Sequence, residues 1–192
     1  MRIVAGSLGG RNFEAPRGHR THPMSEKIRG ALFNALGDIK GLTLLDAYAG
    51  SGAIAIEAVS RGAKSVVAVE ADKNAYDVMI RNRESLGISS TQLQIFLKRC
   101  EAWTRQNQDK FFDVVIIDPP FNLYKYNYLT NERLTRNVKP GGIFVASIPP
   151  SHRENHDHGF NRLKDMEMIF DKNYGDAQLI FYKKHASRTD AA

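Results

Sequence analysis

The stretch Leu44–Gly52 has the sequence LLDAYAGSG, in which an apolar run meets a glycine-rich turn. A short apolar run of this kind is typical of a buried strand, and Ser51–Arg61 has the pattern of a helix that follows it. Glycines let the backbone approach a ligand closely, and the free amides at the start of a helix favour negatively charged groups. In a parallel sheet, such a turn opens onto the crevice that binds nucleotide-like ligands. We therefore expect a ligand site at Gly50–Gly52.

The acid at the end of this strand indicates the kind of ligand. A dinucleotide-binding loop needs a third glycine, whereas Ala53, Ile54 and Ala55 follow Gly52 here. Asp46 is also an unusual neighbour for a pyrophosphate, because like charges repel each other. A carboxylate at this position suits a ligand that carries a cationic amino group. The plainer alternative is a glycine turn that only connects two elements, and its neighbours in the chain argue against that.

Strand-like and helix-like segments alternate through the middle of the chain. Apolar runs predict strands, and periodic apolar positions after N-capping residues predict helices. Such alternation implies a parallel sheet with helices on both faces, since right-handed crossovers return each strand to the same sheet. The expected strands are Leu42–Ala47, Ser65–Glu70, Thr91–Leu97, Phe112–Ile117 and Ile143–Ile148, and the expected helices begin near Ser25, Ser51, Asp72, Glu101 and Leu129, the last ending at Pro140-Gly141-Gly142.

The two ends of the chain depart from this alternation. Leu163–Phe170 and Ala177–Lys184 are β-rich runs around a turn at Asp171–Asp176, which predicts a closing antiparallel hairpin. The predicted fold class is α/β: a doubly wound, mostly parallel seven-stranded sheet with an antiparallel C-terminal hairpin and a small N-terminal hairpin and helix. The expected division of the chain is a basic hairpin extension at 1–24, a main domain at 25–184 and a disordered tail at 185–192.

Composition limits the class of protein. With 192 residues, of which 42% are hydrophobic and 25% charged, the chain has the size and composition of one ordinary globular domain. The sequence contains no apolar run long enough to cross a bilayer, and the residues after Met1 do not resemble a signal peptide. The single Cys100 cannot form an internal disulfide. We therefore expect a cytoplasmic protein with no membrane partner.

A net charge of +6 and an isoelectric point near 9.5 favour a polyanionic partner. The positive charge is concentrated in the first thirty residues, where only Glu14 and Glu26 oppose it. A basic arm of this kind is either a solvated face or a nucleic-acid-binding surface, and charge alone does not decide between them. The candidate RNA-binding residues are Arg2, Arg11, Arg17, Arg20, His22, Lys27 and Arg29.

Two further acids follow expected strands. Glu70 ends the second strand, where a carboxylate can accept both hydrogen bonds of a ribose diol. Asp118-Pro119-Pro120-Phe121 follows the fourth strand, and its prolines fix the backbone and remove two amide donors. The free carbonyls, the carboxylate and the aromatic ring together suit a planar amine, as in the recognition of flipped bases. A rigid turn after a buried strand is the plainer alternative.

These segments together resemble class I S-adenosylmethionine-dependent methyltransferases, and Asp-Pro-Pro-Phe is the variant of those that act on exocyclic amino nitrogens. RIVAGSLGGRNFEAP, THPMSEKIRGALFNAL, LLDAYAGSGAIAIEAVSRGA and the C-terminal YGDAQLIFYKK are similar to the RsmD family of small-subunit (16S) ribosomal RNA guanine-N2 methyltransferases. The resemblance covers nearly the whole chain. Two segments depart from the family pattern: Thr21-His22-Pro23-Met24 replaces Thr-Arg-Pro-Thr, and Cys100-Glu101-Ala102 replaces Gly-Asp-Ala.

The resemblance implies S-adenosylmethionine as cofactor, a methyltransferase domain at 25–184, and methyl transfer to guanine N2. The implied partner is ribosomal RNA or a small-subunit assembly particle. We expect a monomer, because nothing in the sequence suggests an obligate oligomer. No metal is expected, because the histidine-rich run SHRENHDHGF lacks a ligand spacing. The implied cofactor contacts come from Asp46, Ala49, Gly50, Ser51, Gly52, Glu70, Ala71, Glu101 and Ala102, and the implied catalytic residues are Asp118, Pro119, Pro120 and Phe121.

Two other functions stay open. A related enzyme would methylate adenine N6 in nucleic acid or a protein amide, and Asp-Pro-Pro alone does not exclude these, although the N-terminal stretch argues against them. The chain could instead be a non-catalytic RNA-binding assembly factor that retains the fold. The presence of Asp46, Glu70 and Asp118 weighs against that second function. A doubly wound fold does not by itself decide function.

Overall fold

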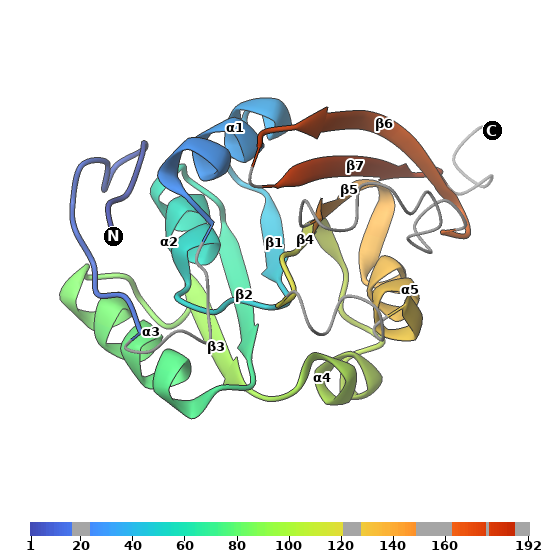
Figure 1. The fold of residues 1–192 in the computed structure, drawn as a ribbon. Helices are drawn as coiled ribbons and strands as arrows, with labels where there is room; N and C mark the ends of the chain where they lie inside the picture. The colour runs from blue at the N-terminus through green and yellow to red at the C-terminus, as the bar shows by residue number, and fades with distance from the viewer. Residues whose placement is uncertain (17–23, 121–127, 149–162, 176, 187–192) are drawn as a thin grey trace.

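The structure of the protein is a computed structural model that describes residues 1–16, 24–120, 128–148, 163–175 and 177–186. Within these residues, a central sheet carries helices on both faces (Figure 1). In chain order the elements are α1 (Glu26–Leu36), β1 (Thr43–Asp46), α2 (Ala53–Ser60), β2 (Ser65–Glu70), α3 (Lys73–Ser85), β3 (Leu93–Leu97), α4 (Cys100–Gln106), β4 (Phe112–Ile117), α5 (Tyr128–Arg136), β5 (Val138–Ile148), β6 (Met166–Asn173) and β7 (Gln178–Lys184).

One sheet of seven strands forms the centre of the fold, in the order β3-β2-β1-β4-β5-β7-β6. β1 runs parallel to β2 and β4, whereas β7 runs antiparallel to both β5 and β6. The predicted mostly parallel sheet with an antiparallel C-terminal hairpin is thus confirmed. After β3 the chain crosses to the other side of β1, and in such sheets ligands bind beyond the carboxyl ends of the strands at this point of reversal.

Alternate residues of the strands pack into two cores, one on each face of the sheet. Leu44 and Val114 belong to the core that α1, α2 and α3 cover, and Leu45 and Val115 to the core that α4 and α5 cover. Trp103 of α4 is fully buried in the second core. Strands buried on both faces have near-continuous apolar sequences, which is why the central segments were recognisable.

Two predicted element boundaries were wrong. α5 ends at Arg136 and β5 begins at Val138, so Pro140-Gly141-Gly142 lies inside a strand instead of ending a helix. The pairing of β4 with β5 is irregular at this point, and irregular pairing is how a strand accommodates a proline. The C-terminal turn also begins later than predicted, because β6 stays paired with β7 up to Asn173.

The N-terminal segment folds back on itself and against the main domain. Arg2 and Asn12 form an antiparallel bridge, which is the pairing that the predicted hairpin requires. Ile3 and Phe13 lie in the same core as Leu32 of α1. The segment therefore shares the core of the main domain, and the predicted division of the chain at residue 24 stays a prediction.

Glu57 of α2 fixes this segment through a fully buried carboxylate. The carboxylate accepts hydrogen bonds from the amides of Val4 (2.8 Å) and Ala5 (3.0 Å). It also pairs with the guanidinium groups of Arg29 (3.4 Å) and Arg61 (2.8 Å). A buried carboxylate needs such compensation, because charge removed from water is costly when unpaired. The N-terminal segment is thus held against α2 by ionic and backbone contacts together.

Asn82 of α3 provides a second attachment. Its Oδ1 accepts a hydrogen bond from the Glu14 amide (2.8 Å), and its Nδ2 donates to the Glu14 carbonyl (2.9 Å). Between the two attachments, Gly6 approaches the main chain at Ser60 so closely that a Cβ would collide with the Ser60 carbonyl. Residues 1–16 therefore follow a defined path along α2 and α3.

Candidate active site at the carboxyl ends of the strands

Three acids meet at one edge of the sheet. β1 pairs in register with its neighbours, with Leu44 opposite Val114 of β4. Parallel strands in such register end at the same side of the sheet. Glu70 and Asp46 therefore lie at the ends of β2 and β1, and Asp118 follows the end of β4, next to β1. The three acids lie at the edge where nucleotide-like ligands bind in doubly wound folds.

Asp46 has a buried carboxylate without a partner. The residue is 1% exposed, and neither carboxylate oxygen has a hydrogen-bond partner of good geometry among the described residues. Burial and then repulsion from Asp118 raise its pKa to about 8, with a smaller contribution from Glu70, while the nearby Ala55 amide opposes the rise. A carboxyl group in this condition is stabilised by a proton or by a cationic ligand.

The glycine turn brings backbone to this edge. Gly50 and Gly52 have positive φ angles of 51° and 76°, and Gly52 precedes α2 without a side-chain cap. A Cβ on Gly52 would lie 2.6 Å from Cγ of Met79. The residue type is thus required both by conformation and by space. The other predicted cofactor residues in the two neighbouring turns are Ala49 and Ser51, which are buried, and Ala71, which is exposed.

Glu70 connects two turns at the same edge. Its Oε2 accepts a hydrogen bond from the Gly50 amide (2.6 Å), and its Oε1 accepts one from the Asp72 amide (2.7 Å). Asp72 is the predicted N-cap of α3 and accepts from the amides of Asn74 and Ala75. Each Glu70 oxygen keeps a second acceptor position, so the carboxylate can still receive ribose hydroxyls. Ribose binding by Glu70 stays a prediction. Its contacts with the two backbone amides were not predicted from the sequence.

Asp118 is half-buried beside β5. Burial raises its pKa to about 6, and a hydrogen bond from the Ser147 hydroxyl opposes that rise. The carboxylate is therefore ionised at neutral pH and can accept further hydrogen bonds. Pro119 is buried and Pro120 exposed. Phe121 lies outside the described residues, so its stacking role stays a prediction.

The predicted adenine segment begins α4. Glu101 is half-buried and lies 4.0 Å from the guanidinium of Arg99, and Ala102 is exposed. Cys100 is buried beside the Tyr48 hydroxyl, and burial raises the pKa of its thiol to about 12. A thiol that stays protonated is a packing group and not a nucleophile. The Tyr48 hydroxyl has no hydrogen-bond partner of good geometry among the described residues.

The predicted RNA-binding residues have different surroundings. Arg2 is exposed and pairs with Glu26 (3.0 Å). Arg11 is exposed and donates to main-chain carbonyls after the last turn of α3, and Lys27 is exposed on α1. These three can face a polyanion. The other predicted contacts, Arg17, Arg20 and His22, lie outside the described residues.

Arg29 cannot contact RNA in this structure, and its assignment is corrected. The side chain is fully buried, and its guanidinium donates to the Glu57 carboxylate and to the carbonyls of Met24 and Arg2. A basic stretch of sequence does not distinguish a surface cation from one that compensates a distant buried acid. Arg29 therefore has a structural role.

Comparison with known proteins identifies the family to which the chain belongs. A family model described as "Conserved hypothetical protein 95" matches residues 1–183. The chain is 35% identical over 124 residues to "Ribosomal RNA small subunit methyltransferase D" of Haemophilus influenzae, a match that spans 64% of each protein. It is 28% identical over 191 residues to "Putative rRNA methyltransferase YlbH" of Bacillus subtilis, which covers 96% of this chain and 99% of that one.

The chain belongs to the RsmD family. Its fold also matches a solved structure, "Putative methyltransferase yhhF from Escherichia coli", with a TM-score of 0.81 and 22% identity. That match covers 97% of this chain and 99% of the other. The comparison supports the class I methyltransferase fold along nearly the whole chain.

RsmD-family methyltransferases use S-adenosylmethionine, and the site fits this group. The buried Asp46 carboxylate matches the cationic amino group of the cofactor, which would satisfy its unpartnered oxygens. Gly52, which has no room for a side chain, keeps the turn at the start of α2 compact beside Asp46. The Tyr48 hydroxyl lies on the same turn, next to Cys100, and adds a polar group on the α4 side.

Sequence reasoning missed two side chains of the RsmD site. Tyr48 lies within the glycine motif, but its hydroxyl was not considered as a cofactor-side group. Ser147 is the one polar residue in the apolar run Ile143–Ile148, and a buried hydroxyl in such a run needs a nearby partner. The sequence therefore indicated that Ser147 has a partner, but not that the partner is Asp118, which follows a different strand.

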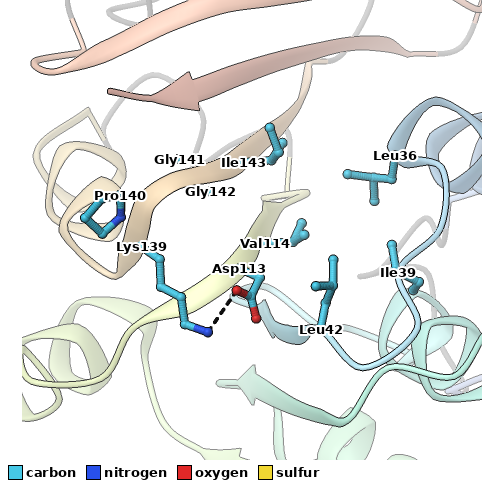
Figure 2. A pocket seen from close by; sticks show the side chains of 10 residues that line it. All are labelled: Leu36, Ile39, Leu42, Asp113, Val114, Lys139, Pro140, Gly141, Gly142 and Ile143. Carbon is cyan, nitrogen blue, oxygen red and sulfur yellow. Dashed lines mark hydrogen bonds and ion pairs between the residues drawn. The ribbon is translucent and has the colours of Figure 1, made fainter. Parts of the chain in front are cut away.

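A hollow of about 270 Å³ lies at the opposite end of the strands (Figure 2). It opens where β1 and β4 begin, between the end of α1 and the start of β5. On its wall, Lys139 pairs with Asp113 (2.8 Å), and Asp113 also accepts hydrogen bonds from Thr43. Because these charged groups satisfy each other and lie far along the strands from Asp46, the hollow is not part of the candidate RsmD active site.

The residues that the structure describes contain neither a membrane-spanning helix nor a cluster of potential metal ligands. None of the helices in that part of the chain has the length and apolar character to span a membrane. The same residues contain no group of three or more potential metal ligands. The histidine-rich run at 151–160 lies outside them, so the expectation of no metal stays a prediction.

Proposed function

We propose that this protein transfers a methyl group from S-adenosylmethionine to the exocyclic N2 amine of a guanine in small-subunit ribosomal RNA. The observation that carries the proposal is the buried, unpartnered carboxylate of Asp46 beside Asp118 at the strand ends. Family membership supports methyl transfer, and the names of the relatives support ribosomal RNA as the substrate class. Guanine N2 is the finer part of the proposal and rests on the Asp-Pro-Pro-Phe sequence.

The first task of the chain is to hold the cofactor. When bound, S-adenosylmethionine supplies an activated methyl group on a sulfonium, so alignment provides most of the catalysis. Asp46 would bind the cationic amino group, and Glu70 the ribose hydroxyls. Glu101 would accept from the adenine amine at the start of α4. The Gly50–Gly52 turn lets the main chain approach the methionine end.

The second task is to hold the target amine. Asp118, ionised at neutral pH, and the carbonyl of Pro119 would each accept a hydrogen bond from the amine. The lone pair of guanine N2 is delocalised into the ring in the ground state. Acceptors on both N–H groups favour the pyramidal geometry in which that lone pair is available, and this preference is greatest in the transition state. Phe121 would stack on the base.

The N-terminal segment would supply phosphate contacts. Arg2 and Arg11 are exposed along the segment that Glu57 and Asn82 attach to the domain, and Lys27 is exposed on α1. Contacts of this kind give affinity that falls as salt rises and carry little sequence information. The proposed substrate is free ribosomal RNA or a small-subunit assembly particle, bound by a cytoplasmic monomer.

The competing functions are methylation of adenine N6 and a non-catalytic role in assembly. An adenine amine would satisfy the same two acceptors, so only product analysis separates the two bases. A binding protein without catalysis would not require the unpartnered Asp46, whose burial destabilises the empty protein. The unfavourable burial of Asp46 in the absence of a ligand therefore favours an enzyme that binds a cationic cofactor.

The test uses purified protein, radiolabelled S-adenosylmethionine, and either free small-subunit RNA or small subunits from a strain that lacks this gene. Nucleosides of the product are then separated. We expect label in N2-methylguanosine. Label in N6-methyladenosine would show that the target base is adenine and not guanine. Tight cofactor binding without transfer to either substrate would favour the non-catalytic role in assembly.

Asp118→Asn is the critical variant, and Asp113→Asn is its matched control on the same strand. Asp113 lies at the other end of β4 and pairs with Lys139. We expect Asp118→Asn to lower kcat by about 100-fold or more, by analogy with the loss of one oriented hydrogen-bonding group in other active sites. Asp113→Asn should keep the parent's kcat and its affinity for S-adenosylhomocysteine, and Asp118→Asn should still bind S-adenosylhomocysteine.

A further inference from the structure

Ser147 occupies a position next to the catalytic carboxylate in the middle of the sheet. The register of β4 and β5 pairs Ile117 with Ala146, so the following residues, Asp118 and Ser147, lie side by side. On its other side, Ser147 pairs with Leu179 of β7. A residue held between two strands has little freedom, and Ser147 is 4% exposed.

The surroundings of this hydroxyl are apolar. Ile117, Ala146 and Ile148 are fully buried, and Ser147 is the one polar side chain of the run Ile143–Ile148. A hydroxyl in such a place is stabilised only if it finds a hydrogen-bond partner. The Asp118 carboxylate is that partner. The polar residue is thus explained by the site and not by the packing of the strand.

Burial would otherwise favour the protonated form of Asp118. The neighbouring acids do not offset burial, because Asp118 and, to a smaller extent, Glu70 raise the pKa of Asp46 instead. Among the described residues, Ser147 is the group that lowers the pKa of Asp118 against burial. A carboxylate that must accept a hydrogen bond from an amine has to be ionised, and a donated hydroxyl hydrogen favours that form.

We infer that Ser147 is a positioning residue, whose buried hydroxyl donates to the Asp118 carboxylate and holds it in the orientation in which it accepts from the target amine. The inference rests on the proposed function for the identity of that amine. The contact between Ser147 and Asp118 does not depend on the proposed function. Because Ser147 is buried within the sheet, we place it behind Asp118 and expect it to act through that carboxylate.

The experiment follows the carboxyl ¹³C signal of Asp118 with pH in the whole protein labelled at aspartate carboxyls, with Asp118→Asn used to assign the signal. In the parent protein the signal should titrate near 6. Ser147→Ala should raise this pKa by about one, the size expected for losing a hydrogen bond to a charged group. Ser147→Thr keeps the hydroxyl and should titrate as the parent does. An unchanged titration in Ser147→Ala would overturn the inference.

Methyl transfer provides the second readout. In Ser147→Ala the acidic limb of the kcat profile should move to higher pH by the same amount, with kcat restored above pH 8. A loss of kcat that is equal at every pH would overturn the inference, because a merely structural defect has no such dependence. If Ser147→Ala does not fold, Ser147→Cys, a weaker donor of similar size, should give an intermediate pKa. A shifted titration in a protein that transfers no methyl group would reject the proposed function and retain the role of Ser147.

Discussion

Asp118 raises the pKa of Asp46 across the gap between two parallel strands. Asp46 lies opposite Ile116 in the β1–β4 register, two residues before Asp118. Both carboxyl groups are stabilised in their protonated forms by burial, and their mutual repulsion couples their ionisation. A cationic ligand on Asp46 relieves this repulsion. Cofactor binding and the state of the catalytic carboxylate are therefore linked by the topology of the sheet.

Asp46→Asn should weaken binding of S-adenosylhomocysteine by about 30-fold or more, because one partner of a buried charge pair is removed. Isothermal titration calorimetry measures the affinity. Asp77→Asn is the matched control, since Asp77 forms an exposed ion pair with Lys73 on α3. The control should bind as the parent does. Equal affinities of Asp46→Asn and the parent would show that the cofactor's amino group lies elsewhere.

The stability of the ligand-free protein should fall as pH rises from 6 to 8, and less so in Asp46→Asn. The folded-state pKa of Asp46, about 8, lies above its unfolded value of roughly 3.9, so the folded state binds more protons within that interval. Its contribution to stability is complete below the unfolded pKa and is lost as pH rises through the folded pKa. Asp118, with a pKa of about 6, has lost most of its contribution by the start of this window.

Scanning calorimetry at several pH values measures this difference as the change in Tm. Titrations of groups that do not interact with Asp46 are common to both proteins and cancel in the comparison. The parent should therefore lose several degrees more than Asp46→Asn between pH 6 and 8. Parallel Tm profiles would contradict a raised pKa for Asp46.

The sequence was most informative where one pattern determined one element. Ser65–Glu70 and Phe112–Ile117 were predicted with the observed bounds, because each is an apolar run buried on both faces. Asp72 was predicted as an N-cap, and its carboxylate accepts two amide hydrogen bonds of α3. The predicted bounds of an element were wrong where one sequence pattern is typical of two different structures. The prolyl-glycyl run at 140–142 can end a helix or lie in an irregular strand, and only pairing with β4 decides between these.

The candidate site was predicted in its main acids but not in what supports them. Asp46 and Asp118 follow recognisable strands, so the parallel topology alone brings them to one edge. Ser147 and Glu57 act on residues distant in sequence, and no local pattern identifies such partners. The prediction that Arg29 binds RNA was wrong for the same reason, because the acid that it compensates lies on α2.

Glu57→Gln should destabilise the fold and release the N-terminal segment. The substitution leaves Arg29 buried without a compensating charge, which costs about 3–5 kcal/mol in comparable cases. Urea denaturation measures the loss of stability, and limited proteolysis measures exposure of the first sixteen residues. Glu26→Gln removes the exposed pair with Arg2 and serves as control, with an expected loss below about 1 kcal/mol. Similar losses in the two variants would mean that Glu57 does not anchor the segment.

Gly52→Ala should destabilise the protein more than Gly87→Ala, although both glycines have positive φ, 76° and 71°. The added methyl group at residue 52 would meet the buried side chain of Met79, whereas a Cβ at residue 87 has nothing within 4 Å. Conformational strain costs about 1 kcal/mol or more in both variants, and overpacking adds about 1–3 kcal/mol in the first alone. Urea denaturation gives the two losses. Because Gly52 also begins the cofactor turn, Gly52→Ala should in addition weaken S-adenosylhomocysteine binding, which Gly87→Ala should leave intact. Equal losses of stability would show that Met79 can move aside, and unchanged binding would show that the turn tolerates a side chain.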